Sequence, residues 1–405
     1  MGLRWRPSVS YDAHCPLFSV GWSWGDATRG LLAVSTFVDE YERDHPQDAQ
    51  HELQVLHVPI DTPASSTSDP TSDRTEAVTC LGRVPYKLPA TKVGWIPDFS
   101  GMQPHLLATS GDALRIWRVS ERSSSSAAVA ERAAKDDGFA GADVLDACAA
   151  DWAPQYDITP HCELSRIKMS GIDAGPGGRG QDAPSTSFDW NETDTSLLGV
   201  CSIDTTCSLW DITQQQIRTQ LIAHDKEVYD FSFGPGTDLF ATCGADGSIR
   251  MFDLRDLNRS TVLYENATST PLLRVAWNSQ NPHYIGCVTM RSHKIIIVDI
   301  RMPSVPAVTL EQNQCVDLPE VGLARAASHD CVTGIAWAPF ADHVLLSAGD
   351  SGVASLWDLS DTSQGRPMPA LSYNAGRTIH GVQWSPADPN WIALTAGSQL
   401  QVIYC

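Results

Sequence analysis

One apolar pattern that ends in an aromatic residue recurs seven times along this 405-residue chain. Its copies are VGWSWG at Trp22, VGWIPD at Trp95, FDWNET at Trp190, FSFGPG at Phe233, VAWNSQ at Trp277, IAWAPF at Trp337 and VQWSPA at Trp384. A second apolar run follows each copy, as in LRIWRV, CSLWDI, IRMFDLR and ASLWDL. Because the chain exceeds the usual size of a single core, the repeat predicts one architecture that grows by adding units.

The repeated unit reads as β-structure. Each unit offers three strand-like runs and the linking stretch supplies a fourth, with β-branched and aromatic residues between Gly, Asp and Ser turns. The regular steps, 190 to 233, 233 to 277 and 337 to 384, are 43, 44 and 47 residues, near the ~40–45 typical of WD-repeat blades. We therefore expect an all-β, seven-bladed WD-repeat β-propeller that spans residues 1–405 as a single domain.

The last unit is incomplete. The chain ends within its third strand, at VIYC, so this unit has no outer strand of its own. We expect the segment from Arg4 to Asp12 to supply that strand, which would close the ring and cover an exposed sheet edge.

Four polar stretches lengthen the connections between strands. Residues 61–75 are expected to form a disordered loop between outer strands, and residues 120–160 a low-complexity loop after the second blade, with at most a marginal helix. Residues 171–185 are expected to form a flexible loop and residues 311–328 a further loop insertion.

Composition restricts the partners. The net charge of -20 disfavours direct binding of nucleic acid, because a phosphate backbone would be repelled. Eleven scattered cysteines without a CxxC pair indicate reduced thiols and neither disulfides nor a metal site. No signal peptide and no apolar run of membrane-spanning length are present, so we expect no membrane association and a cytoplasmic and nuclear location.

The most regular unit contains His224, Thr242, Asp246 and Phe252, at the places where WD repeats form a buried hydrogen-bonded tetrad. The same residue types would suit a hydrolase, but the spacing favours the structural role. Phe252 lacks the indole N–H of the usual Trp. In the sixth unit His329 and Trp357 are kept, whereas Asp350 lies one position early.

No motif for nucleophilic, metal-dependent or nucleotide chemistry is visible, so we expect a protein that is not an enzyme and needs no cofactor. A propeller hydrolase is the alternative from another class, because a site assembled from distant loops would escape a motif search. The loop residues Asp225, Lys226, Glu227 and Tyr229 mix charge with an aromatic ring and are candidates for a protein interface on a rim.

Two units end in Asp-x-Arg, at Asp253 and Arg255 and at Asp299 and Arg301. This ending resembles the WDxR motif by which some WD-repeat proteins dock on the damaged-DNA-binding adaptor of cullin-4 ubiquitin ligases. Both copies lack the preceding Trp, and an ion pair within the chain is the alternative interpretation.

Longer strings, including SFDWNETD, SIDTTCSLWDI, TQLIAHDKEVYDFSF and GADGSIRMFDLR, resemble the WD-repeat regulators typified by plant Transparent Testa Glabra and its animal counterpart, a cullin-ligase-associated factor. The resemblance implies a scaffold that bridges helix–loop–helix and MYB transcription factors or tethers dual-specificity kinases to substrates. It implies a monomeric propeller within larger complexes. A substrate receptor of a cullin-4 ligase is the alternative function.

Overall fold

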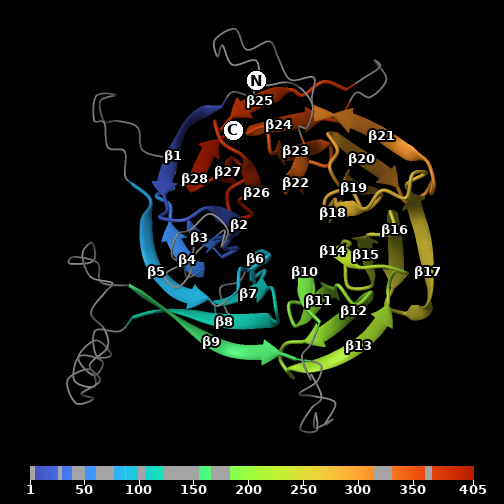
Figure 1. Cartoon of the computed structure of the whole chain (residues 1–405), viewed down its shortest axis with the longest axis horizontal. Helices are drawn as coiled ribbons and strands as arrows, with labels where there is room; N and C mark the ends of the chain where they lie inside the picture. The colour runs from blue at the N-terminus through green and yellow to red at the C-terminus, as the bar shows by residue number, and fades with distance from the viewer. Residues whose placement is uncertain are drawn as a thin grey trace.

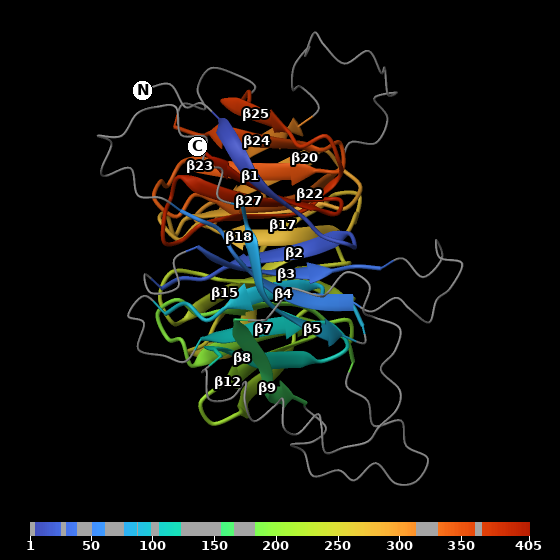
Figure 2. The ribbon, with the colours of Figure 1, turned by 90° about the vertical axis from the view of Figure 1, so that its left-hand side faces the viewer.

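The computed structural model describes residues 5–25, 30–38, 51–60, 77–86, 88–98, 105–122, 155–165, 183–312, 331–360 and 367–405. Within these ranges the chain forms 28 strands, which pair antiparallel in seven four-stranded sheets. Figure 1 shows the sheets arranged as blades around a central opening, and Figure 2 shows the ring from its side. The fold is a seven-bladed β-propeller, as the repeat predicts.

Each blade runs from its innermost to its outermost strand. Blades 1 to 3 consist of β2 (Leu17–Trp22), β3 (Leu31–Thr36), β4 (His51–His57) and β5 (Thr79–Tyr86); β6 (Lys92–Trp95), β7 (Leu106–Ser110), β8 (Leu114–Glu121) and β9 (Tyr156–Leu164); and β10 (Ser185–Trp190), β11 (Leu197–Ser202), β12 (Thr206–Asp211) and β13 (Gln216–Ile222).

Blades 4 to 6 consist of β14 (Val228–Phe233), β15 (Leu239–Gly244), β16 (Ser248–Asp253) and β17 (Asp256–Glu265); β18 (Leu272–Trp277), β19 (Tyr284–Thr289), β20 (Lys294–Asp299) and β21 (Pro306–Glu311); and β22 (Val332–Trp337), β23 (Val344–Gly349), β24 (Val353–Asp358) and β25 (Leu371–Asn374). Blade 7 consists of β26 (Ile379–Trp384), β27 (Trp391–Ala396), β28 (Gln399–Tyr404) and β1 (Arg6–Asp12).

The sequence of each strand follows from its place in the blade. Every residue of the second strands β3, β11 and β23 is buried, because neighbouring blades cover both faces of the sheet. Such strands read as continuous apolar runs. The outer strand β13 alternates between exposed and half-buried residues, because solvent reaches one of its faces.

One hydrogen bond joins each pair of neighbouring blades beside the aromatic residue that ends the inner strand. At four junctions the indole Nε1 of a Trp donates to the carbonyl of a Gly or Ala in the preceding blade: Trp95 to Gly21 (3.0 Å), Trp190 to Gly94 (3.4 Å), Trp337 to Ala276 (3.0 Å) and Trp384 to Ala336 (3.3 Å). At the other three, a polar side chain replaces the Gly or Ala and accepts the main-chain N–H of the aromatic residue: Gln383 from Trp22 (2.6 Å), Asp189 from Phe233 (2.8 Å) and Ser232 from Trp277 (3.0 Å). Every junction thus keeps at least one polar link inside an apolar interface.

One glycine is required by the packing between blades 3 and 4. A Cβ added at Gly199, in β11, would overlap the ring of Phe231 from β14. Phe231 is 1% exposed and stacks on Phe240 with ring centroids 4.8 Å apart. The aromatic core of blade 4 therefore reaches the backbone of its neighbour.

The N-terminal strand closes the ring, as predicted. β1 pairs antiparallel with β28, with Arg6 opposite Tyr404 and Asp12 opposite Gln399. The Gln399 amide Nε2 also donates to Asp12 Oδ1 at 3.1 Å. Figure 1 shows β1 at the outer edge of the last blade, so the first and last strands of the chain share one sheet.

The predicted loop insertions lie largely outside the described residues. Residues 61–75 fall in the gap between β4 and β5, whereas the 120–160 insertion lies inside the second blade, between β8 and β9. Its predicted position after that blade was wrong, because residues 156–164 form the blade's outer strand. The bounds expected for the loops at 171–185 and 311–328 each overlap a strand by one residue, since Ser185 begins β10 and Glu311 ends β21, and most of both ranges lies outside the described residues. The possible helix in the 120–160 insertion lies outside the described residues.

Candidate protein-binding site

The inner strands of all seven blades line a central channel with a cavity of about 290 Å³. Because the strands alternate in direction, one rim of the ring carries the blade-to-blade connections and the turns between second and third strands. We call it the connection rim. The opposite rim carries the turns between first and second and between third and fourth strands. Each inner strand begins at the connection rim.

A β-bulge near the start of the inner strand recurs in six blades. The pairing of β2, β10, β14, β18, β22 and β26 with its neighbour shifts register at the second residue. A bulge inserts one extra residue and re-aims the side chains beside it. Consecutive residues, such as Thr186 and Ser187 or His380 and Gly381, therefore both line the cavity.

Charged residues occupy equivalent places in three inner strands. Lys92, Asp230 and Arg274 each lie three residues before the aromatic residue that ends the strand. The corresponding residues of the sixth and seventh blades are Gly334 and Gly381. All five residues line the cavity. At this position the channel wall is therefore charged in blades 2, 4 and 5, whereas the glycines of blades 6 and 7 carry no side chain.

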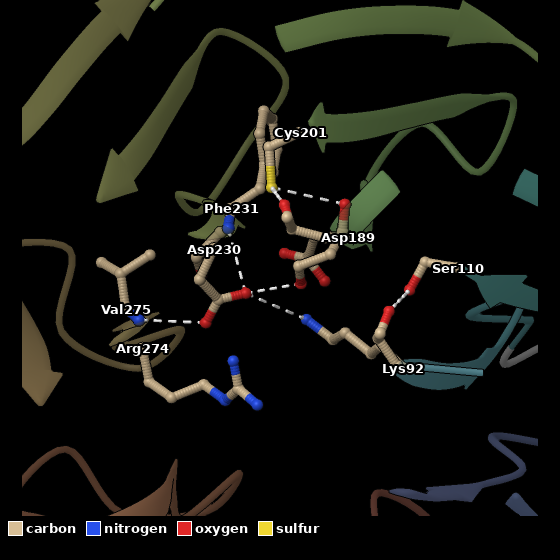
Figure 3. A network of polar contacts seen from close by, with 12 residues as sticks. Lys92, Ser110, Asp189, Cys201, Asp230, Phe231, Arg274 and Val275 are labelled. Atoms are coloured by element: carbon tan, nitrogen blue, oxygen red, sulfur yellow. Dashed lines mark hydrogen bonds and ion pairs between the residues drawn. The ribbon is translucent and has the colours of Figure 1, made fainter. Parts of the chain in front are cut away.

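Asp230 is fully engaged by its neighbours (Figure 3). Its Oδ1 accepts hydrogen bonds from the Ser187 hydroxyl at 2.5 Å and from the Phe231 main-chain N–H at 3.0 Å. Its Oδ2 accepts the Val275 N–H at 3.0 Å, and the Lys92 ammonium lies 3.7 Å from Oδ1. At 4% exposure this carboxylate is compensated by charge and by hydrogen bonds from three blades, which fixes its position.

Asp189 lies closer to the opposite rim, one residue before Trp190. One oxygen accepts the Phe233 N–H at the junction between blades 3 and 4. Burial raises the pKa of Asp189 to about 6, and the negative charge of Asp230 adds to this rise. The positive charge of Lys92 and the hydrogen bond from Phe233 act in the opposite direction and lower the pKa in part. A carboxyl group with this pKa changes charge close to neutral pH.

The predicted tetrad residues lie together in the fourth blade. His224 Nδ1 is 2.9 Å from Asp246 Oδ2, and His224 Nε2 is 2.8 Å from the Thr242 hydroxyl. Burial alone would raise the pKa of Asp246, but the hydrogen bond and charge of His224 hold it well below its usual range. The fourth residue, Phe252, stacks on Phe240 with centroids 5.0 Å apart and adds only packing.

The tetrad geometry does not suit catalysis. His224 and Thr242 are completely buried and neither lines the central cavity. Both ring nitrogens of His224 are engaged, so neither is available to a substrate. The geometry therefore favours the structural role over a hydrolase centre.

Blades 2 and 6 build the same contact from other residues. The indole of Trp357 donates to Ser347 Oγ at 2.8 Å, and Ser347 donates to the side-chain oxygen of Gln312 at 2.9 Å. Gln312 thus makes the contact expected of His329, which lies outside the described residues. In the second blade Trp117 donates to Thr109 at 3.0 Å, and the Tyr86 hydroxyl bonds to the same oxygen.

The predicted rim loop lies on the connection rim, between β13 and β14. Asp225, Lys226 and Glu227 are exposed, and Tyr229 is half-buried. Asp225 pairs with Arg250 at 2.7 Å. The loop therefore presents charged side chains to solvent on the rim where the inner strands begin.

Both Asp-x-Arg turns lie on the opposite rim, where third strands lead into fourth strands. Arg255 Nη2 is 2.6 Å from Asp253 Oδ2, and Arg301 Nη2 is 2.6 Å from Asp299 Oδ2. Each Asp-x-Arg turn thus contains an ion pair within the chain, which is the alternative to docking on a ligase adaptor. Arg255 Nη1 also lies 3.8 Å from Asp238 Oδ2. The two arginine side chains are nevertheless 69% and 57% exposed, so solvent reaches both guanidinium groups.

Within the described ranges, no three His, Cys, Asp or Glu side chains gather as metal ligands would. In the same part of the chain, no helix is long and apolar enough to cross a membrane.

Several of these residues were missed in the sequence. Lys92, Asp189, Asp230 and Arg274 were not singled out, although counting back from each aromatic residue places three of them in register. Gln312 and Tyr86 were missed because a glutamine and a tyrosine stand where the WD repeat usually has a histidine. Each directly follows or ends an outer strand, and that position is the signal that could have identified them.

A closed ring of seven such blades, with a buried polar tetrad in the fourth, defines a WD-repeat β-propeller. Residues 214–253 and 323–358 match the family model described as WD domain, G-beta repeat. Over 394 residues the chain is 36% identical to the "DDB1- and CUL4-associated factor 7 homolog" of Dictyostelium discoideum, which covers 97% of each protein. The chain therefore belongs to the family of DDB1- and CUL4-associated factor 7.

Fungal WD-repeat proteins are also similar to this chain. A WD repeat-containing protein of Saccharomyces cerevisiae is 33% identical over 371 residues, covering 87% of this chain and 58% of the yeast protein. An uncharacterized WD repeat-containing protein of Schizosaccharomyces pombe is 34% identical over 319 residues, covering 74% of this chain and 61% of that protein.

Proposed function

We propose that this protein is a non-enzymatic scaffold that assembles protein complexes. The observation that carries the proposal is the match over 97% of both chains to a WD-repeat protein named for its association with DDB1 and CUL4. A ring closed by its own first strand offers two rims and a channel as fixed surfaces, so several partners can bind at once. The tetrad that first suggested catalysis is buried within one blade.

The partners follow from the family resemblance. We propose transcription factors of the helix–loop–helix and MYB types, or dual-specificity kinases held near their substrates, in both cytoplasm and nucleus. The net charge of -20 favours basic surfaces on these partners.

Affinity purification of the tagged protein from its own cells, followed by mass spectrometry, tests the scaffold function. We expect stoichiometric recovery of transcription factors or kinases. Recovery of the propeller alone, from cells that express it at its natural level, would contradict the proposal. Fluorescence microscopy of the same cells tests the proposed location.

A second function, substrate receptor of a cullin-4 ubiquitin ligase, is supported by the two Asp-x-Arg turns. They occur in neighbouring blades, on one rim, with the same internal geometry and with exposed guanidinium groups. Arg is well suited to such an interface because its planar fork forms several hydrogen bonds.

The double substitution Arg255→Ala and Arg301→Ala tests this receptor function. We expect it to reduce co-purification of the DDB1 adaptor at least tenfold while leaving thermal stability nearly unchanged, because surface ion pairs contribute about 0–1 kcal/mol. Arg259→Ala, which removes an exposed arginine from the outer strand β17, is the matched control. Full retention of the adaptor by the double variant would refute docking through these arginines.

A further inference from the structure

Arg274 has an unusual environment for an arginine inside a channel. Among the described residues, its guanidinium forms one hydrogen bond, from Nη1 to the Leu273 carbonyl at 3.2 Å, and no ion pair with a carboxylate. A guanidinium carries several N–H donors in a planar fork. Most donors of Arg274 are therefore available to a ligand.

The nearby carboxylate Asp230 does not neutralise this arginine. Its two oxygens are engaged by Ser187, Phe231 and Val275, and Lys92 supplies its opposite charge at 3.7 Å. Figure 3 shows Lys92 directed at Asp230, whereas the guanidinium of Arg274 extends into the channel with no dashed contact. The polar network is thus complete without Arg274.

The channel has room for a ligand beside Arg274. Gly334 and Gly381 hold the equivalent places in the next two blades and line the same cavity of about 290 Å³. A cavity of this size admits a side chain or a short extended segment but not a folded element. Arg274 is the third residue of β18, so it lies near the connection rim, from which a segment would enter.

We propose that the channel binds an acidic side chain, a Glu or Asp of an extended partner segment that enters from the connection rim, through Arg274. This inference rests on the proposed scaffold function. A carboxylate can accept two parallel N–H bonds from the guanidinium, and the restricted solvent of the channel strengthens that pairing. The two carboxyl groups of the channel, Asp189 and Asp230, favour a singly charged carboxylate over a phosphate that carries nearly two charges.

The channel charge gives this binding a pH dependence. Besides Lys92, Asp230 and Arg274, the titratable groups that line the cavity are Asp189 and His380. Burial raises the pKa of Asp189 to about 6 and lowers the pKa of His380. As the pH falls from 8 toward 6, Asp189 begins to lose its negative charge. His380 also gains a positive charge as the pH falls, at a lower pH than an ordinary histidine because burial lowers its pKa. Affinity for an acidic segment therefore increases as the pH falls.

Four peptides that differ at one position test the site. The probes are acetyl-Gly-Ser-X-Ser-Gly-amide with X as Glu, Gln, Lys or phosphoserine, titrated into the full chain by calorimetry at constant ionic strength. We expect the Glu peptide to bind at least tenfold more tightly than the Gln peptide, and more tightly at pH 6 than at pH 8. Arg274→Gln should abolish this preference, and Arg259→Gln, on the outer strand, should preserve it.

If circular dichroism shows that Arg274→Gln does not fold, Arg274→Lys replaces it, because Lys keeps the charge and loses the fork. We expect that variant to weaken binding of the Glu peptide several-fold. Equal binding of the Glu and Gln peptides, tightest binding of the Lys peptide, or an undiminished preference in the Arg274 variant would overturn the proposal. Tightest binding of the phosphoserine peptide would overturn the assignment to carboxylates. Because affinity purification reports on partners independently, a failed peptide assay with intact complexes would leave the scaffold function standing.

Discussion

The substitution Asp189→Asn is expected to stabilise the protein at neutral pH. Burial raises the pKa of Asp189 from 3.8 to about 6, so the folded state binds this proton more tightly than the unfolded chain. Stability contributed by this residue therefore decreases as the pH rises through the window from about 4 to about 6. Asparagine resembles the neutral acid, and its side-chain oxygen can still accept the Phe233 N–H that links blades 3 and 4.

The shift of roughly two pK units corresponds to about 3 kcal/mol of destabilisation at pH 7.5. Water in the channel screens the charge of this half-buried side chain, so we expect a measured gain between about 1 and about 3 kcal/mol. At pH 5.5, where the folded protein holds the proton most of the time, the gain should be smaller by roughly a quarter.

Urea unfolding of both proteins, followed by tryptophan fluorescence at pH 7.5 and pH 5.5, measures this difference. Both pH values lie above the isoelectric point near 4.8, which keeps the protein charged and soluble. Burial, and after it the charge of Asp189, raises the pKa of Glu192 to about 7, so the substitution also relieves Glu192 and adds to the gain at pH 7.5. Groups that do not interact with Asp189 cancel in the comparison. An unchanged or lower midpoint for Asp189→Asn at pH 7.5, or an advantage that grows as the pH falls, would refute the reasoning.

Three further experiments test the packing and the tetrad. Gly199→Ala should cost about 2–3 kcal/mol, because its Cβ overlaps the Phe231 ring; adding Phe231→Leu should recover part of the loss in thermal melts. Asp246→Ala should cost about 2–3 kcal/mol in urea unfolding, because the buried His224 Nδ1 loses its charged partner and keeps only the Ser248 hydroxyl at 3.2 Å; an effect below about 1 kcal/mol would contradict this. Trp95→Phe should destabilise the protein by about 1 kcal/mol more than Trp22→Phe in the same melts. Trp95 loses the hydrogen bond from its indole N–H to the Gly21 carbonyl, whereas the indole N–H of Trp22 has no partner.

The blade repeat could be read from the sequence because the aromatic residues have one place in the fold. Each ends an inner strand and is buried between two blades, so its spacing records the blade size. The role of the N-terminal segment followed from the same count, since the last unit was one strand short. These inferences depend on burial, which a hydrophobic pattern reports directly.

Outer strands are less visible in a sequence. The sequence does not mark β9 as a strand, because its residues YDITPHCEL contain a proline and no apolar run. Only one residue of this strand is buried, so the sequence carries little of the apolar signal that marks an inner strand. The boundaries expected for the loops at 171–185 and 311–328 each fall one residue inside a strand, in β10 and β21.

The channel charges could not be assigned a common site from local sequence. Lys92, Asp230 and Arg274 come from three blades, and only closure of the ring brings them to one cavity. Their direction also depends on a bulge beside them in β14 and β18, and bulges leave no clear composition signal. The tetrad of the fourth blade could be predicted from the sequence because its polar members are close together along the chain.

Pairing of β1 with β28 also orders events during synthesis. Of the strands of the ring, β1 leaves the ribosome before all others and its partner residues 399–404 leave after all others, on the order of half a minute later at usual elongation rates. Six blades have all their strands before the circle can be completed, and until then two blade faces remain without neighbours. Until residues 399–404 are made and pair with β1, the nascent propeller is an open arc with uncovered apolar faces, which exposes it to aggregation.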